Sequence, residues 1–279
     1  MSANTPSAYK GFNLETGDRI LFFLKVGVIA LVFLAFGVGA TSLLVAAACA
    51  AMGYEWFRMA TGGRAFDEPM VGTVLAAAAV PPFVTFAAGA GAGAAVAGLG
   101  AGFLLVLGPT SNDTPLVKAA LGVFVIALAG VCFVWLRDHP EHGLALTAWL
   151  IAVVAAAEIG SGFYATRLSP NGELVPAEKR DLPLGPMFGI GCGIFAGLLV
   201  AAFYRDGNFF WVILASLLVA GVVLAAGLTT RYVRGSVESA PSGSLFLGRG
   251  AVIENFDGLV WASLVAGALM MVTGALFNW

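Results

Sequence analysis

The feature of this sequence that most constrains its fold is a series of long apolar runs, separated by short segments that hold the charged residues. A helix needs about 20 mostly apolar residues to cross the hydrocarbon core of a bilayer, and its backbone must satisfy its own hydrogen bonds there. Hydrophobic residues make up 59% of the 279 residues and charged residues 11%, which is more apolar surface than a soluble domain of this size can bury. The sequence therefore predicts an all-α, polytopic integral membrane protein.

The apolar runs predict about nine transmembrane helices. The run from 20 to 57 is too long for one helix, and Gly37 and Gly39 near its middle predict a helical pair with a tight connection. The run around Gly89 is rich in glycine and alanine, which let helix backbones pack closely, and it contains no polar break. The other seven predicted spans are 71–88, 89–108, 116–136, 144–166, 185–204, 208–228 and 258–278.

The basic residues predict the orientation of these spans, because positively charged loops tend to stay in the cytoplasm. With a cytoplasmic N-terminus, the outer loops hold only Arg137 and Arg205. The inner side then holds Lys10, Arg19, Arg58, Arg64, Lys118, Arg167, Lys179, Arg180, Arg231, Arg234 and Arg249. We therefore expect four parts: a cytoplasmic N-terminal segment (1–19), a membrane domain (20–278), and cytoplasmic loops within it at about 167–184 and 229–257. The net charge of −2 gives no sign of a nucleic-acid partner.

Three acidic residues are candidates for chemistry. Glu158 lies at or inside the membrane boundary, where an ionised carboxylate is costly and usually functional. The alternative is that it pairs with a nearby arginine and fixes helix packing. Glu254 and Asp257 open the last span at i, i+3 spacing, which places both carboxylates on one helix face. Their alternative role is to interact with the N-terminus of that helix.

The segment before the last span, RYVRGSVESAPSGSLFLGRGAVIENFDGL, combines arginines, a glycine-rich turn and carboxylates at the edge of the bilayer. Hard divalent cations bind carboxylate oxygens, and arginine side chains neutralise phosphate charge. This combination indicates a phosphorylated ligand held through metal ions. The alternative for the arginines is contact with anionic lipid headgroups.

The segment LFLGRGAVIENFDGLVWA resembles the C-terminal signature of bacterial phosphatidate cytidylyltransferases, in which a Gly-His-Gly-Gly turn is followed by Asp-Arg-x-Asp and the last span. Gly248 and Gly250 match two of the glycines, and Asp257 matches the second aspartate. Arg234, in TRYVRG, matches the basic position that opens the signature. Two earlier segments, AAMGYEWFRMA and AAAEIGSGFYATR, are similar to the end of an early helix and to a middle segment of that family, with Glu158 at an aspartate position.

The resemblance implies a multi-pass enzyme of the bacterial inner membrane that uses Mg²⁺ to transfer a cytidylyl group from CTP to phosphatidic acid, giving CDP-diacylglycerol and pyrophosphate. By this resemblance Asp257 is the best candidate metal ligand, with Glu254 and Glu158 as further ligands. The residues expected to hold phosphates are Arg234, Arg249, Lys179 and Arg180, with Gly248 and Gly250 in the turn.

The sequence also departs from the family signature. Arg249 stands at the position of the histidine, Asn255 at that of the arginine, and Ala240 and Pro241 at those of a Lys-Asp pair. An alternative is therefore a catalytically inactive family member that serves as a structural subunit of a membrane complex; a homodimer is a further option. A transporter that uses Glu158 as an intramembrane carboxylate would be expected to show an inverted repeat, which the sequence does not display.

His139 and His142 have HxxH spacing in the short polar link RDHPEHG, which the topology predicts to be external. Zinc sites need further ligands, and the link offers no cysteine. A solvated loop is the favoured interpretation.

Overall fold

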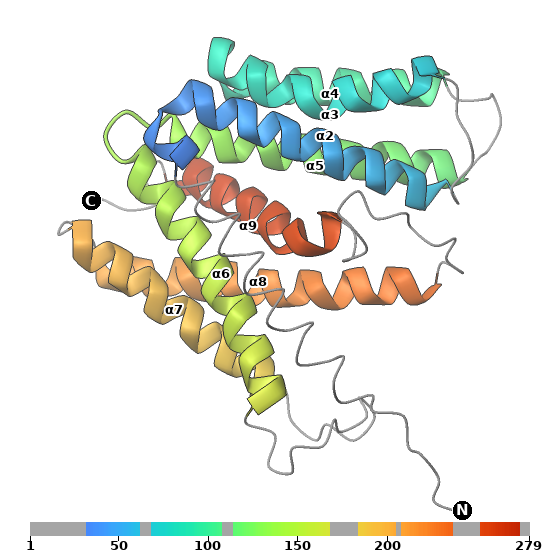
Figure 1. Cartoon of the computed structure of the whole chain (residues 1–279). Coiled ribbons are helices and arrows are strands. Elements are labelled where there is room, and N and C mark those ends of the chain that lie inside the picture. The colour runs from blue at the N-terminus through green and yellow to red at the C-terminus, as the bar shows by residue number, and fades with distance from the viewer. Residues whose placement is uncertain are drawn as a thin grey trace, which may run out of the picture.

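The computed structural model describes residues 32–61, 68–107, 114–167, 184–204, 208–236 and 252–273, and these residues contain helices but no strand. The helices alternate in direction along the chain (Figure 1). Their bounds are α2 Val38–Ala60, α3 Glu68–Ala88, α4 Ala90–Leu107, α5 Thr114–Arg137, α6 Gly143–Arg167, α7 Leu184–Tyr204, α8 Phe209–Ser236 and α9 Val252–Thr273. The predicted all-α class is confirmed.

Most of these helices can cross a membrane. Within the described ranges, the seven helices α2 to α8 contain segments that are long and apolar enough to span a bilayer, and α9 contributes a shorter apolar segment, Phe256–Val272. Residues 20–31, which belong to the first half of the predicted helical pair, lie outside the described residues. The polytopic membrane architecture is confirmed for the part of the chain that the structure describes.

Two glycines separate neighbouring helices where the sequence gives little polar signal. Gly37 has φ 97° and separates the helical residues 32–35 from α2, and Gly89 has φ 87° between α3 and α4. Glycine adopts this left-handed region without the steric cost that a Cβ atom brings. The predicted breaks near Gly37 and Gly89 are both confirmed.

The helices around the predicted loop 229–257 extend farther than expected. α8 continues through Ser236 and α9 already begins at Val252, so both ends of that predicted loop are helical. Hydropathy marks only the part of a helix inside the hydrocarbon core, whereas backbone hydrogen bonds can continue the helix into the interface. The helices therefore extend beyond the predicted spans 208–228 and 258–278 at this end, whereas the apolar segment of α8, Phe209–Gly227, agrees with the predicted span.

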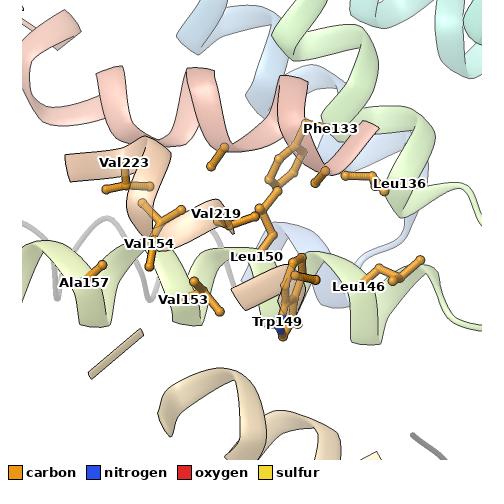
Figure 2. Packing of buried hydrophobic residues seen from close by; sticks show 14 of the residues in the cluster. Phe133, Leu136, Leu146, Trp149, Leu150, Val153, Val154, Ala157, Val219 and Val223 are labelled. Carbon is orange, nitrogen blue, oxygen red and sulfur yellow. The ribbon is translucent and has the colours of Figure 1, made fainter. Parts of the chain in front are cut away.

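The helices form two groups, and both α5 and α9 contribute to each. α2 to α5 surround one buried cluster, which includes Phe57 and Val123, whereas α6 to α9 surround a second cluster around Trp149, to which α5 adds Phe133 and Leu136. Figure 2 shows the second cluster, where Trp149 and Val153 of α6 lie near Val219 of α8. Trp149 donates a hydrogen bond from Nε1 to Ser216 Oγ at 3.0 Å, which ties α6 to α8 inside the bundle.

α9 contacts both groups through different faces. Its Ala262 and Ala266 belong to the α6 to α9 cluster, whereas Val260 belongs to the α2 to α5 cluster. In Figure 1, α9 lies between the upper helices and α8, and α6 crosses the bundle obliquely. The first turns of α9 are therefore held between helices that are far apart in the sequence.

The alternating topology defines two ends of the bundle. At the first, which we call the carboxylate end, α6 and α8 finish and α9 begins. At the second, the histidine end, α5 finishes and α6 begins, with His139 and His142 between them. Arg58 lies in the last turn of α2 and Lys118 near the start of α5, both on the side of the carboxylate end. The assignment of this end to the cytoplasm stays a prediction.

Candidate functional site

Glu158 is oriented into the bundle by the apolar stripe of α6. Val154 and Leu150 lie four and eight residues before it, both are buried, and residues at this spacing lie on one face of a helix. Ala157, directly before Glu158, is also buried, and Figure 2 shows it at one end of the packed cluster. Glu158 continues this stripe and is partly buried.

Asp257 is carried by the second turn of α9. The residues that follow on the inner face are small, because Gly258, Ala262 and Ala266 recur at four-residue intervals and all three are buried. This spacing allows α9 to approach α6 and α8 closely. Asp257 is partly buried, and its Oδ1 accepts a hydrogen bond from the backbone N–H of Gly258 at 2.7 Å.

The two carboxylates meet where α6 crosses the start of α9. Glu158 Oε1 lies so close to Gly258 that a Cβ atom there would overlap it, and the carboxylates of Glu158 and Asp257 repel each other electrostatically. Val223 of α8 forms the third side of this junction, because its Cγ1 would lie 3.0 Å from the same Cβ. The fold thus brings together two acidic residues that are 99 positions apart in the sequence.

The like charges of this pair bear on the kind of ligand that could bind beside it. Among the described side chains, Glu158 forms no ion pair with a basic residue, so the alternative of a packing salt bridge has no observed partner there. Two like charges close together and partly shielded from water destabilise each other unless a proton or a cation intervenes. A divalent cation with oxygen ligands would remove this repulsion.

The structure describes the other predicted site residues only in part. Glu254 lies on α9, three residues before Asp257, and Arg234 lies on α8, but the side chains of both are outside the described set. The predicted residues Lys179, Arg180, Gly248, Arg249 and Gly250 also lie outside the described residues. In the described ranges, no three His, Cys, Asp or Glu side chains are grouped as metal ligands would be.

The histidines at the opposite end have a different environment. The rings of His139 and His142 stack with centroids 5.8 Å apart, and His142 Nε2 lies 3.6 Å from Glu141 Oε2. Glu141 is exposed, with 79% of its side chain accessible. The described residues place no third metal ligand beside the two histidines.

Two residues near the carboxylate end have no role predicted from the sequence. One is Gly258, although an isolated glycine inside a helix costs about 1 kcal/mol relative to alanine and often has a packing or functional reason. Glu55 of α2 lies in the segment AAMGYEWFRMA, and only 7% of its surface is exposed. The sequence alone does not mark this carboxylate as buried, because its segment shows only a resemblance to the end of an early helix.

Comparison with known proteins finds similarity to enzymes that carry one name. No protein-family profile matches the chain. It is 26% identical over 149 residues to the phosphatidate cytidylyltransferase of Helicobacter pylori (strain ATCC 700392 / 26695), a match that covers 53% of each chain. It is 28% identical over 159 residues to the phosphatidate cytidylyltransferase of Brucella suis biovar 1 (strain 1330), with 57% of each chain covered.

The chain spans about half the length of the curated relatives that it matches. Its apolar helices and its bacterial relatives identify a multi-pass bacterial membrane protein. The chain is therefore a divergent relative of the phosphatidate cytidylyltransferase family.

Proposed function

We propose that this chain transfers a cytidylyl group from CTP to phosphatidic acid and so forms CDP-diacylglycerol and pyrophosphate. The observation that carries the proposal is the pairing of Glu158 and Asp257, from two helices that the fold packs together at one end of the bundle. The names of the similar proteins support the same reaction. Both carboxylates belong to segments that resemble the family signature.

The residues present fit a divalent cation. Glu158 and Asp257 offer oxygen ligands from two helices, and Glu254 lies one turn before Asp257 on α9. Mg²⁺ prefers such ligands and is commonly held by one or two carboxylates together with substrate phosphates. When bound, Mg²⁺ would neutralise phosphate charge and stabilise the attacking and leaving oxygens.

The remaining task of the protein is to bring two anions together. An oxygen of the lipid phosphate attacks the α-phosphorus of CTP, and the bond from that phosphorus to the pyrophosphate oxygen breaks. In the proposal the basic side chains hold the phosphates and reduce their mutual repulsion. These residues are Arg234, Arg249, Lys179 and Arg180, with the backbone of Gly248 and Gly250 in the turn.

The position of the pair suits a lipid substrate. Glu158 lies within α6 and Asp257 near the start of α9, so the two carboxylates lie near the edge of the apolar, membrane-spanning segments of these helices. Phosphatidic acid could present its headgroup there while its acyl chains remain in the bilayer. CTP would arrive from the water on the same side.

The proposal is tested with purified protein in detergent micelles that contain phosphatidic acid and Mg²⁺. We expect label from the α-phosphate of CTP to appear in the lipid extract, with one pyrophosphate released for each labelled lipid. Omission of phosphatidic acid or addition of EDTA should stop both signals. If the chain gives no labelled lipid while a known phosphatidate cytidylyltransferase works under the same conditions, the proposed reaction is wrong.

A second candidate is a catalytically inactive subunit of a membrane complex or a homodimer. The replacements at Arg249, Ala240 and Pro241 favour it, because they remove a histidine and a Lys-Asp pair that the resembled signature contains. This candidate predicts that Asp257→Ala leaves complex formation unchanged. Size analysis of the unaltered and altered proteins, extracted gently from membranes, measures that property separately from turnover.

A further inference from the structure

The contact between Glu158 and α9 depends on residue 258 being glycine, which has no side chain. A Cβ atom built on Gly258 would overlap Glu158 Oε1 and lie 3.4 Å from Glu158 Cδ. Gly258 has no positive φ, so its backbone conformation does not itself require glycine. The requirement comes from the close approach of a carboxylate on the facing helix.

The group that would have to move is the end of a flexible side chain. Glutamate reaches its carboxylate through three rotatable bonds, so a methyl group at position 258 would displace the Glu158 carboxylate more readily than it would separate α6 from α9. The second neighbour, Val223 Cγ1, would lie 3.0 Å from the new Cβ and needs to shift by only a few tenths of an ångström. The expected consequence is a folded protein with a displaced carboxylate.

We infer that Gly258 is a positioning residue, whose lack of a side chain lets the Glu158 carboxylate lie beside Asp257. Its consequence for turnover rests on the proposed function, whereas its consequence for cation binding does not. An aspartate at position 158 would end one methylene sooner and would tolerate a side chain at 258. Glu158 and Gly258 are thus a size-matched pair across the α6 and α9 contact.

The test uses the full chain in detergent and Mn²⁺ alone as the probe, with free Mn²⁺ measured by electron paramagnetic resonance. We expect Gly258→Ala to weaken Mn²⁺ binding by about 10-fold, which is a typical loss when a residue that positions a metal ligand is changed. In the Glu158→Asp background the same substitution should change the affinity by less than about twofold, because the clash is gone. Addition of Val223→Ala to Gly258→Ala should not restore Mn²⁺ binding, because the new Cβ would still overlap the Glu158 carboxylate.

A matched control is available on the same helix. A Cβ on Gly267 would lie 2.7 Å from Cys132 Sγ and 2.9 Å from Cys132 Cβ, so Gly267→Ala overpacks the α9 and α5 contact nine residues from Gly258. We expect Gly267→Ala to lower the unfolding temperature more than Gly258→Ala does, with Mn²⁺ affinity unchanged. A loss of Mn²⁺ binding in both variants would show that general packing, and not the Glu158 carboxylate, controls the site.

Other outcomes also decide the inference. It is wrong if Gly258→Ala leaves Mn²⁺ affinity unchanged, if its effect is equal in both backgrounds, or if Val223→Ala rescues it. If Glu158→Asp alone binds no Mn²⁺, the unfolding temperatures of the unaltered chain, the two single variants and the double variant test the inference. Gly258→Ala should then lower the unfolding temperature less in the Glu158→Asp background than in the unaltered chain. If Mn²⁺ binding follows the expected pattern but no labelled lipid forms, the proposed function fails and the positioning role stands.

Discussion

The charged side chains at the two ends of α6 have neighbours of opposite kinds. At the histidine end, Arg137 Nη2 donates a hydrogen bond to the Leu34 carbonyl at 2.8 Å, and His142 lies beside Glu141. At the carboxylate end, Glu158 lies beside Asp257, a residue of its own charge, and has no basic partner among the described side chains.

This difference lies in the sign of the neighbouring charges. At the histidine end Arg137 and His142 each have a partner of complementary character, although Arg137 Nε and His139 Nδ1 are buried without a hydrogen-bond partner among the described residues. Two carboxylates in a partly buried junction repel each other, and a proton or a cation reduces that repulsion. We therefore propose the carboxylate end as the place where a divalent cation binds.

The largest effect is expected from Asp257→Ala. Loss of the best candidate ligand should reduce cytidylyl transfer by about 100-fold or more, because both the cation and its position are lost. The protein should still insert and fold, since Asp257 is only partly buried. The measurement is the labelled-lipid assay together with an unfolding temperature in detergent.

Asp138→Ala is the control for that variant, because Asp138 is exposed at the histidine end and loses the same atoms. Near-normal transfer by Asp257→Ala, or an equal loss in both variants, would show that the site is misplaced.

Glu158→Gln should have the next largest effect. It keeps the size of the side chain and removes one of the two like charges, so Mg²⁺ binds more weakly. We expect transfer at limiting Mg²⁺ to fall by about 10-fold, with partial recovery at high Mg²⁺. Titration of the rate with Mg²⁺ measures this shift, and a rate whose Mg²⁺ dependence is unchanged would exclude Glu158 as a ligand.

Arg137→Met should change stability and leave chemistry alone. It removes the charged donor to the carbonyl of Leu34, a residue that is only 2% exposed. Loss of a hydrogen bond from a charged group costs about 1.5–3 kcal/mol. We expect a lower unfolding temperature and an unchanged transfer rate per folded molecule; a selective loss of rate would link the two ends of the bundle.

Glu141→Gln should have the smallest effect. The Glu141 side chain is 79% exposed and its distance to His142 is 3.6 Å, and exposed pairs of this kind contribute about 0–1 kcal/mol. We expect the unfolding temperature and the Mg²⁺ dependence to stay within experimental error of the unaltered chain. A lost metal response in Glu141→Gln would instead favour a metal site at the histidines.

The sequence predicted the architecture because the membrane imposes strong local rules. Apolar runs of sufficient length marked the spans, and glycine marked the breaks at Gly37 and Gly89. Hydropathy could not locate the ends of α8 and α9, because both helices continue beyond their apolar residues, to Ser236 and from Val252. Those ends depend on backbone hydrogen bonding outside the hydrocarbon core.

The candidate site was predictable residue by residue but not as an arrangement. The acidic character and membrane position of Glu158, and the spacing of Glu254 and Asp257, singled them out. That Glu158 meets α9 at Gly258, with Val223 of α8 on the third side, depends on which helices pack together. Helical periodicity shows the buried face of each helix but not its partner.

The most direct test of the central claim is an experimental structure of the chain with CTP and Mn²⁺, using anomalous scattering to locate the metal. We predict an anomalous peak between the carboxylates of Glu158 and Asp257, with nucleotide phosphates on its open side. A peak elsewhere, or two carboxylates that point away from each other in the occupied protein, would contradict the account.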